Sequence, residues 1–484
     1  MKSLKSLVKV LRPSEKRLLL HYYSRNTNSE EKLRLALFKL VEKGVESDSE
    51  ARLKLKSNAS VSAYSHLKSR LKNDILNVLL MQDTTKRLAQ GNRAAELDCR
   101  KKVAQSHLLL LRGAQVEGMK VLKQALKAAD KFELLAERLQ INHQLREFFV
   151  GATSTNELGR LNKEISKDLK IYEALLYVEE QSFVLSSPEF AKNLRTRAKE
   201  AEYLVLIEEL GNLFRKHKLA RIGFWYYMAA TEYHRARKNF EDVVVIGLKF
   251  LKLVEKRPSV KSKNNMAGVN QTVGGGYFEL RQFESAIVHF SKAEKLFPAS
   301  GFNRLVPLQY LALAEAAIAN YTGSLRHVGV ALSHPRVATR ESLVPRWLFM
   351  KASVEFLKGE VDQSFKTINS NGYLMKQQDA WNIQYRLLEM MQLISKRDEE
   401  WLEFKLDATR KFLTRHKDLD SPRVRTAIDI FGNLLRKDLD FNLLSDKNLQ
   451  GLNACLNEEK GFIWNPSSPE IVRFDYWIQS NRSD

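Results

Sequence analysis

The first residues that could do chemistry are three consecutive glycines, Gly274, Gly275 and Gly276, because glycine-rich loops can cradle a phosphate group. The motifs that would complete such a site are missing. The sequence contains no G-x-x-x-x-G-K-S/T, no H-E-x-x-H and no G-x-S-x-G, and no G-x-G-x-x-G follows a strand. Because the periodicity around the three glycines predicts a helix, we expect them to serve helix packing.

Metal and thiol chemistry is not indicated either. The ten histidines are scattered singly, and none lies three or four residues from another histidine or a cysteine. Cys99 and Cys455 are the only cysteines, and neither belongs to a C-x-x-C pair, so we expect two buried thiols. The sequence therefore predicts no metal, no cofactor and no enzymatic activity.

An aromatic run, Phe224-Trp225-Tyr226-Tyr227, is the remaining candidate for ligand contact, because aromatic rings supply large stacking surfaces. Consecutive residues point in different directions around a helix. We therefore expect at least two of the four rings to pack in the core.

Composition favours helices throughout. The 484 residues are 44% hydrophobic with only 21 Gly and 10 Pro, which is typical of helices joined by short connections. Lys5, Lys9 and Arg12 interrupt the apolar residues of the N-terminus, and no window approaches 18 apolar residues. We expect a cytoplasmic protein without a membrane span.

The net charge of +22 is unevenly distributed. Residues 1–150 contain 30 Lys and Arg against 16 Asp and Glu, whereas residues 151–484 contain 49 against 41. A basic surface attracts nucleic acid and other polyanions. Lys and Arg are also good helix formers that keep a surface soluble, so both explanations stay open.

Residues 1–90 read as a small basic helical unit. Pro13-Ser14-Glu15 opens one helix, a second spans residues 28–43, a short one lies near 51–55, and a long one spans about 60–81. Lys68, Arg70 and Lys72 lie on the outer side of the long helix and are possible polyanion-binding residues. A helix-turn-helix-like regulator bound to nucleic acid is therefore the alternative function, although the second helix is longer than that fold's.

From about residue 93 the sequence alternates helices with short turns. The clearest unit is Asn270–Pro298, which resembles the tetratricopeptide repeat. That family has a small residue, an aromatic, Ala, an aromatic, Ala and Pro at six defining positions, and here these are Gly274, Tyr277, Ala286, Phe290, Ala293 and Pro298.

Neighbouring units are degenerate copies. Their turn residues Phe240, Phe283, Tyr321 and Val361 lie 43, 38 and 40 residues apart, longer than the usual repeat of about 34. The resemblance implies an all-α protein, a right-handed α-solenoid of divergent tetratricopeptide-like helix pairs with a small N-terminal helical unit. The whole arrangement also resembles a group of uncharacterised bacterial helical-repeat proteins, which implies a fold and no activity.

The predicted domains follow from these patterns. Residues 1–90 form the basic unit, 91–255 divergent repeats, 266–440 clearer repeats and 441–484 a C-terminal cap. Pro, Ser and Lys cluster in the predicted linker, residues 256–265.

In such repeats the first helix of each pair lines a concave groove. The resemblance implies that nine residues of this chain occupy the groove positions. They are Trp225, Met228, Glu232, Arg235, Gln271, Phe278, Gln309, Phe349 and Phe356. The positions that form a Lys and Asn clamp for carboxylates in some repeat proteins hold other residues here. We therefore expect a non-enzymatic scaffold that binds a protein or peptide partner, whose identity the sequence leaves open together with the oligomeric state.

Overall fold

The protein is described by a computed structural model that covers residues 1–25, 29–55, 60–81, 92–151, 155–185, 197–340, 343–369 and 380–482. Within these ranges all regular secondary structure is helical, which confirms the predicted all-α class. The chain divides into two compact units, Met1–Ser166 and Lys167–Asp484. The finer boundaries proposed from the sequence stay predictions.

The first unit begins with five helices around one apolar core. They are α1 (Lys2–Val10), α2 (Pro13–Arg25), α3 (Ser29–Glu42), α4 (Asp48–Lys54) and α5 (Val61–Met81). Leu19, Leu37 and Leu71 are fully buried at its centre. The expected start of α2 is confirmed, because Pro13 opens the helix and the Glu15 carboxylate accepts a hydrogen bond of 2.7 Å from the Arg12 amide. Helix α1 is the element that the sequence reading missed.

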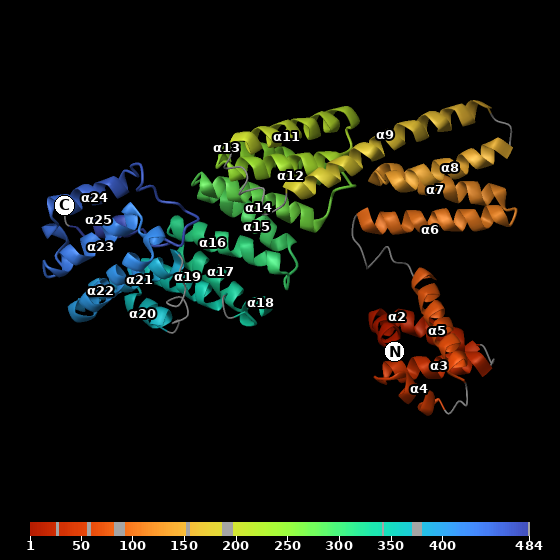
Figure 1. Cartoon of the computed structure of the whole chain (residues 1–484), viewed down its shortest axis with the longest axis horizontal. Helices are drawn as coiled ribbons and strands as arrows, with labels where there is room; N and C mark the ends of the chain where they lie inside the picture. The colour runs from red at the N-terminus through yellow and green to blue at the C-terminus, as the bar shows by residue number, and fades with distance from the viewer. Residues whose placement is uncertain are drawn as a thin grey trace. The chain divides into compact units, whose positions relative to one another are not determined.

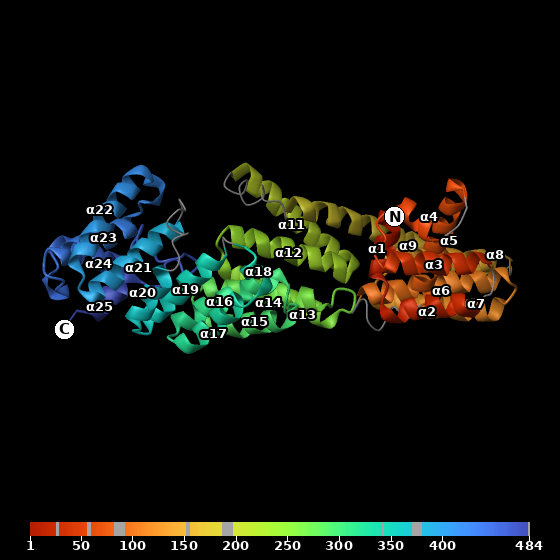
Figure 2. The same ribbon diagram turned by 90° about the horizontal axis from the view of Figure 1, so that it is seen from below.

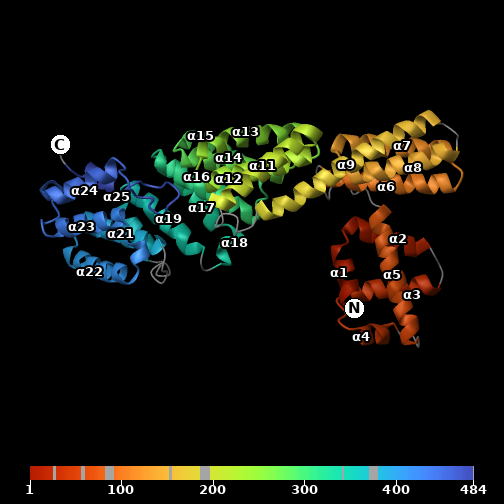
Figure 3. The same ribbon diagram turned by 45° about the horizontal axis from the view of Figure 1, so that its top comes forward.

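Three further helices of this unit lie side by side (Figures 1 and 3). They are α6 (Asn92–Leu111), α7 (Gln115–Phe132) and α8 (Leu135–Gly151), and they are followed by α9 (Thr155–Leu185). Where α6 meets α7, the buried Ser106 hydroxyl donates a hydrogen bond of 2.8 Å to the Gly118 carbonyl. The absence of a side chain at Gly118 lets the two backbones approach closely.

The second unit is a solenoid of consecutive helix pairs (Figure 1). Its helices are α11 (Arg197–His217), α12 (Ala220–Ala236), α13 (Phe240–Lys256), α14 (Lys263–Glu279), α15 (Phe283–Leu296), α16 (Leu305–Ala317), α17 (Tyr321–Leu332), α18 (Pro335–Ala338), α19 (Val344–Leu357), α20 (Val361–Asn369), α21 (Ala380–Lys396), α22 (Glu399–Arg415), α23 (Pro422–Leu435), α24 (Asp446–Leu456) and α25 (Phe474–Ser480). Apart from the short α18, each helix packs against the next, and α14 contacts α16, α19 contacts α21 and α21 contacts α23. Figure 2 shows α13, α15 and α17 along one side of this stack. The predicted helix-pair solenoid is therefore confirmed.

The same turn joins the two helices of five successive pairs. In each, an amide bonds to the carbonyl five residues earlier, as in Gln282 to Tyr277 at 2.9 Å and Asn320 to Glu315 at 2.8 Å. The residue just before that amide has a positive φ, and these five residues are Lys238, Arg281, Ala319, Gly359 and Arg397. The predicted turn residues Phe240, Phe283, Tyr321 and Val361 begin the second helices α13, α15, α17 and α20.

The pair α14–α15 shows why the repeat pattern needs small residues. A Cβ atom at Gly274 would lie 3.1 Å from the Phe290 ring, so glycine makes room for that ring. Ala286, Phe290 and Ala293 are fully buried. All three glycines lie inside α14 as predicted, but only Gly274 and Gly276 serve helix packing, because a Cβ atom at Gly275 would meet no neighbour within 4 Å.

The degenerate pairs replace an alanine contact with a hydrogen bond. Ser324 in α17 donates to the Ala312 carbonyl of α16 at 2.7 Å, and Ser364 in α20 donates to the Ala352 carbonyl of α19 at 2.6 Å. Both serines are fully buried, and each hydroxyl is satisfied by the backbone of the paired helix. Serine therefore preserves the close approach that alanine provides in the clearer repeat.

Candidate functional site

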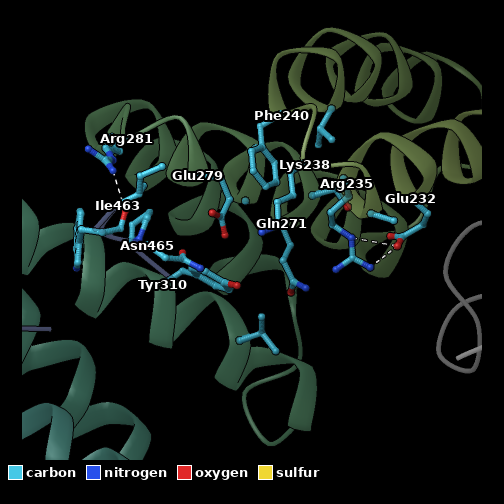
Figure 4. Close-up of a pocket in the computed structure, with 18 residues that line it drawn as sticks. Glu232, Arg235, Lys238, Phe240, Gln271, Glu279, Arg281, Tyr310, Ile463 and Asn465 are labelled. Atoms are coloured by element: carbon cyan, nitrogen blue, oxygen red, sulfur yellow. Dashed lines mark hydrogen bonds and ion pairs between the residues drawn. The ribbon is translucent and has the colours of Figure 1, made fainter. Parts of the chain in front are cut away.

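The first helices of the solenoid border a hollow of about 680 Å³, which we call the first hollow (Figure 4). It lies among the ends of α12 and α14, the start of α13, part of α16, and residues 463–466, which belong to the segment between α24 and α25. This volume is within the range of pockets that hold small ligands or peptide side chains.

One wall of the first hollow is the face of α14 that carries Gln271 and Gly275. A Cβ atom at Gly275 would have no neighbouring atom within 4 Å, so this glycine leaves space unfilled. The Gln271 Oε1 atom is buried, and no hydrogen-bond donor among the described residues reaches it. Figure 4 shows the Gln271 side chain extending between α12 and Tyr310. The wall therefore combines open space with a free acceptor.

Charges of both signs border this hollow. The Arg235 guanidinium pairs with Glu232 one turn earlier on α12, and its side chain is 63% exposed. Lys238 is exposed at the positive-φ position of the α12–α13 turn and has no acidic partner within the described part of the chain. A ligand carboxylate could therefore pair with Lys238 without breaking an existing ion pair.

Arg281, at the equivalent position of the α14–α15 turn, holds a segment from much later in the chain. Its guanidinium donates to both oxygens of the Glu458 carboxylate, at 2.8 and 2.5 Å, and to the Trp464 carbonyl at 2.8 Å. The same guanidinium lies 5.3 Å from the centre of the Trp464 ring. On α14, Glu279 accepts a hydrogen bond from the Ser467 hydroxyl.

We call residues 458–470 the strap. They belong to the stretch of residues 457–473 between α24 and α25 that has no regular helix, and Figure 1 shows this stretch reaching back towards α16. The Asn465 side chain accepts from the Ser467 amide at 2.9 Å, so a turn inside the strap shapes it locally. Structureless connections of this length are uncommon and are usually lids or binding loops.

A second hollow of about 570 Å³ lies on the other side of the strap. It is bordered by α16, by the ends of α14 and α19, and by α25. Arg281, Trp464 and Pro466 border both hollows, so the strap is the partition between them.

A buried ionic network anchors the end of the strap that leads into α25. Arg423 on α23 donates to the Glu470 carboxylate at 2.6 and 2.8 Å and to Asp475 at 2.8 Å. Arg473 joins Asp475 to Glu458 at 2.6 and 3.1 Å. Burial by itself raises the pKa of Asp475, but the hydrogen bonds from Arg473 and Arg423 outweigh it, so this pKa lies below its ordinary value.

The structure brings three of the predicted groove residues together. Glu232, Arg235 and Gln271 border the first hollow. Trp225 and Met228 are partly buried, and Met228 packs against the core of α12–α14. Gln309 is partly exposed on α16 and borders neither hollow. Partner binding by these residues stays a prediction.

The three predicted groove phenylalanines are core residues. Phe278 is 1% exposed beneath the Tyr310 ring, and Phe349 is 2% exposed against Trp381. Phe356 is 5% exposed and packs against Trp477 of α25. Counting positions from the repeat pattern placed them on an open face, but the following helices and α25 cover that face. A partner cannot reach their rings in this structure except at the edges of the second hollow.

The aromatic run on α12 divides as expected. Phe224 and Tyr227 pack against Phe250 of α13, with ring centres 5.0 and 5.9 Å apart. Tyr226 instead stacks on Phe214 of α11 at 6.2 Å. At least two of the four rings are therefore used for helix packing.

The predicted polyanion-binding residues on α5 are largely engaged within the first unit. Lys68 pairs with Asp48 at 2.9 Å and lies over the Tyr64 ring, and Arg70 pairs with Glu30. Lys72 is partly buried. Two of the three cations are thus already neutralised by neighbouring carboxylates, which reduces the charge that they offer to a phosphate backbone.

Other kinds of site are not apparent in the described residues. Among them, no group of three or more His, Cys, Asp or Glu side chains is arranged to hold a metal ion. Cys99 and Cys455 are fully buried as expected, and burial raises the pKa of their thiols to about 11 and about 12. No helix in the described ranges combines the length and apolar character that crossing a bilayer requires.

The sequence reading missed Lys238, Gly275, Arg281 and Trp464. Lys238 and Arg281 were detectable, because they precede the predicted turn aromatics Phe240 and Phe283 by two residues. The return of Trp464 onto α14 has no sequence signal, because it depends on a contact across 183 residues.

No protein-family model and no curated protein sequence matches this chain. Solved structures to which this chain is similar include a Rap protein complexed with Competence and Sporulation Factor, at 14% identity and a TM-score of 0.41, covering 72% of this chain and 98% of that one. The apo form of the quorum sensor NprR from B. thuringiensis matches at 16% identity and a TM-score of 0.42, covering 67% and 86%.

A third match is the signal-transduction ATPase with a tetratricopeptide-repeat sensor from Pyrococcus horikoshii. It has 13% identity and a TM-score of 0.37, and the match covers 84% of this chain and 53% of that one. The printed name of this third protein assigns the tetratricopeptide repeat to its sensor.

Proposed function

We propose that this protein is a non-enzymatic scaffold that binds an extended segment of a partner protein in the first hollow. One observation carries the proposal: the α14 wall leaves open space at Gly275 beside the buried, unpaired Gln271 Oε1 atom. A buried acceptor without a donor costs free energy, and a backbone amide of a bound segment would supply that donor once the Gln271 side-chain amide turns towards the hollow.

The surrounding charges support a peptide with at least one carboxylate. Lys238 offers an exposed ammonium group, and Arg235 offers a guanidinium whose present partner, Glu232, lies on its own helix. Because exposed ion pairs within a helix are weak, Arg235 can exchange Glu232 for a ligand carboxylate at little cost.

The test uses two matched glycines on α14. Gly275→Phe fills the first hollow, whereas Gly268→Phe adds the same ring on the same helix, away from the residues that border it. Neither Cβ atom would meet a neighbour within 4 Å, and replacing a helical glycine removes a residue of poor helix propensity, so both variants should fold.

A displayed library of random peptides is selected on the wild-type chain, and affinities of the selected peptides are measured by fluorescence anisotropy. We expect Gly275→Phe to weaken binding at least tenfold and Gly268→Phe to leave it unchanged. Peptides that bind both variants as tightly as the wild type would place the binding site elsewhere.

A further inference from the structure

The strap contacts α14 in the way that a bound peptide would. It lies against the solenoid largely through side chains, with Arg281 donating to the Trp464 carbonyl and Glu279 accepting from Ser467. Its most prominent side chain, Trp464, lies between two guanidinium groups, 5.3 Å from that of Arg281 and 5.1 Å from that of Arg473. The solenoid therefore already holds one extended segment of its own chain, which offers an aromatic ring, Trp464, and a carboxylate, Glu458.

The strap is firmly held at one end and weakly held over α14. At its Glu470 end the carboxylate pairs with Arg423, and the side chains of both residues are only 7% exposed. The Arg281–Glu458 pair is more accessible, since the side chains are 37% and 19% exposed. Water screens such a pair, and it opens more easily than a buried one.

Opening the strap would change the shape of the surface. Because Arg281 and Trp464 border both hollows, moving the strap away from Arg281 joins the first and second hollows along α14 and α16. The opened surface keeps the guanidinium of Arg281 without its carboxylate and aromatic partners.

We infer that this surface takes a partner segment carrying an aromatic residue and a carboxylate, and that the segment displaces the strap from Arg281. The inference rests on the proposed function, because it names the chemistry and the regulation of the same groove. Arg281 is then the residue that recognises the partner, and the strap competes with the partner for it.

Positive charge next to an aromatic ring is the basis of this selectivity. A guanidinium accepts a carboxylate in two parallel hydrogen bonds and also stacks on an aromatic face, which an ammonium group does less well. Arg281 does both at once with Glu458 and Trp464. A partner that offers the same two groups can replace both contacts together.

The probe is a labelled synthetic peptide with the sequence of residues 458–470, which contains both groups. Its affinity is measured for the full chain, for the full chain with Trp464→Ala, and for the control Trp401→Ala. Trp401 is a matched control because it is 56% exposed on α22 and also lies under a cation, Lys405, away from both hollows.

We expect Trp464→Ala to bind the probe about tenfold more tightly than the wild type, because a weakened strap leaves the groove open for a larger fraction of the time. Trp401→Ala should behave as the wild type. Adding Arg281→Gln to Trp464→Ala should remove the gain, and a probe with alanine in place of its tryptophan should bind weakly. Ser467→Ala, a milder change in the strap, should give a smaller gain in the same direction.

Equal affinity for the wild type and both strap variants would overturn the inference, and so would binding that survives Arg281→Gln. The two proposals fail differently. If library peptides lose affinity with Gly275→Phe but gain nothing from Trp464→Ala, the first hollow is a binding site and the strap is only structural. Dimers of the wild type that dissociate with Arg281→Gln would identify a second copy's strap as the occupant and would rule out a separate partner protein.

Discussion

Replacing Arg423 with methionine should release the anchored end of the strap. Arg423 is 6% exposed and bridges the buried carboxylates of Glu470 and Asp475 through charge-assisted hydrogen bonds. Methionine preserves much of the volume and removes the charge, which leaves Glu470 without its hydrogen-bonded cation. Breaking a buried ion pair from one side typically costs about 3–5 kcal/mol. Asp475 retains Arg473, which favours the lower end of that range.

Because a solenoid's repeats interact mainly with their neighbours, this loss should be local to the end of the array. The assay is native-state hydrogen exchange of the amides of α23 and α25. Their exchange rates report the free energy of local opening of these helices. A loss of about 3 kcal/mol corresponds to exchange roughly 100-fold faster. The helices around α14 should exchange at wild-type rates.

Arg425→Met is the matched control. Arg425 lies two residues further along α23 and pairs with Asp420, but its side chain is 66% exposed. Exposed pairs contribute little, so its removal should leave exchange in α25 unchanged. If Arg423→Met and Arg425→Met had similar small effects, the network would not anchor the strap and the reasoning would be refuted.

Three further predictions concern single residues. Ala319 has a φ of +59° in the α16–α17 turn, so Ala319→Gly should relieve strain worth about 0.5–1 kcal/mol and raise the midpoint of thermal unfolding. Ala317→Gly, at the end of α16, should lower that midpoint. Equal effects of the two changes would contradict strain at Ala319. Burial lowers the pKa of His327 from 6.5 to about 4. The neutral imidazole's contribution to the free energy of unfolding is therefore fully present above about pH 6.5 and falls by roughly 2–3 kcal/mol as the pH drops towards 4. In His327→Gln, the free energy of unfolding measured in urea should change less across this pH range. Because burial raises both thiol pKa values, Cys99 and Cys455 should resist a thiol reagent at about pH 8 until the chain unfolds, and rapid modification of the native chain would show that one of them is accessible.

Much of the fold could be predicted because local patterns determine it. The turn residues Phe240, Phe283 and Tyr321 begin second helices, and Gly274 and Gly276 of α14 lie where packing needs a small residue. These features depend on residues close in sequence and on the regular spacing of apolar positions. The degenerate pairs were recognisable for the same reason, since Ser324 takes the place of an alanine.

The site could be predicted only in part. The spacing of Glu232, Arg235 and Gln271 along their helices predicts that they face the same groove, and all three border the first hollow. The burial of Phe356 depends on Trp477 of α25, which is 121 residues away in the sequence. The strap is equally non-local, and nothing in the residues around Trp464 indicates that Arg281 binds it.

The most direct test of peptide binding in the first hollow is hydrogen exchange of the full chain, measured with and without a saturating concentration of a library-selected peptide. We predict that the peptide protects the amides of α14 and of the α12–α13 turn and speeds exchange in residues 458–470. Protection confined to other helices, with α14 and the strap unchanged, would contradict it.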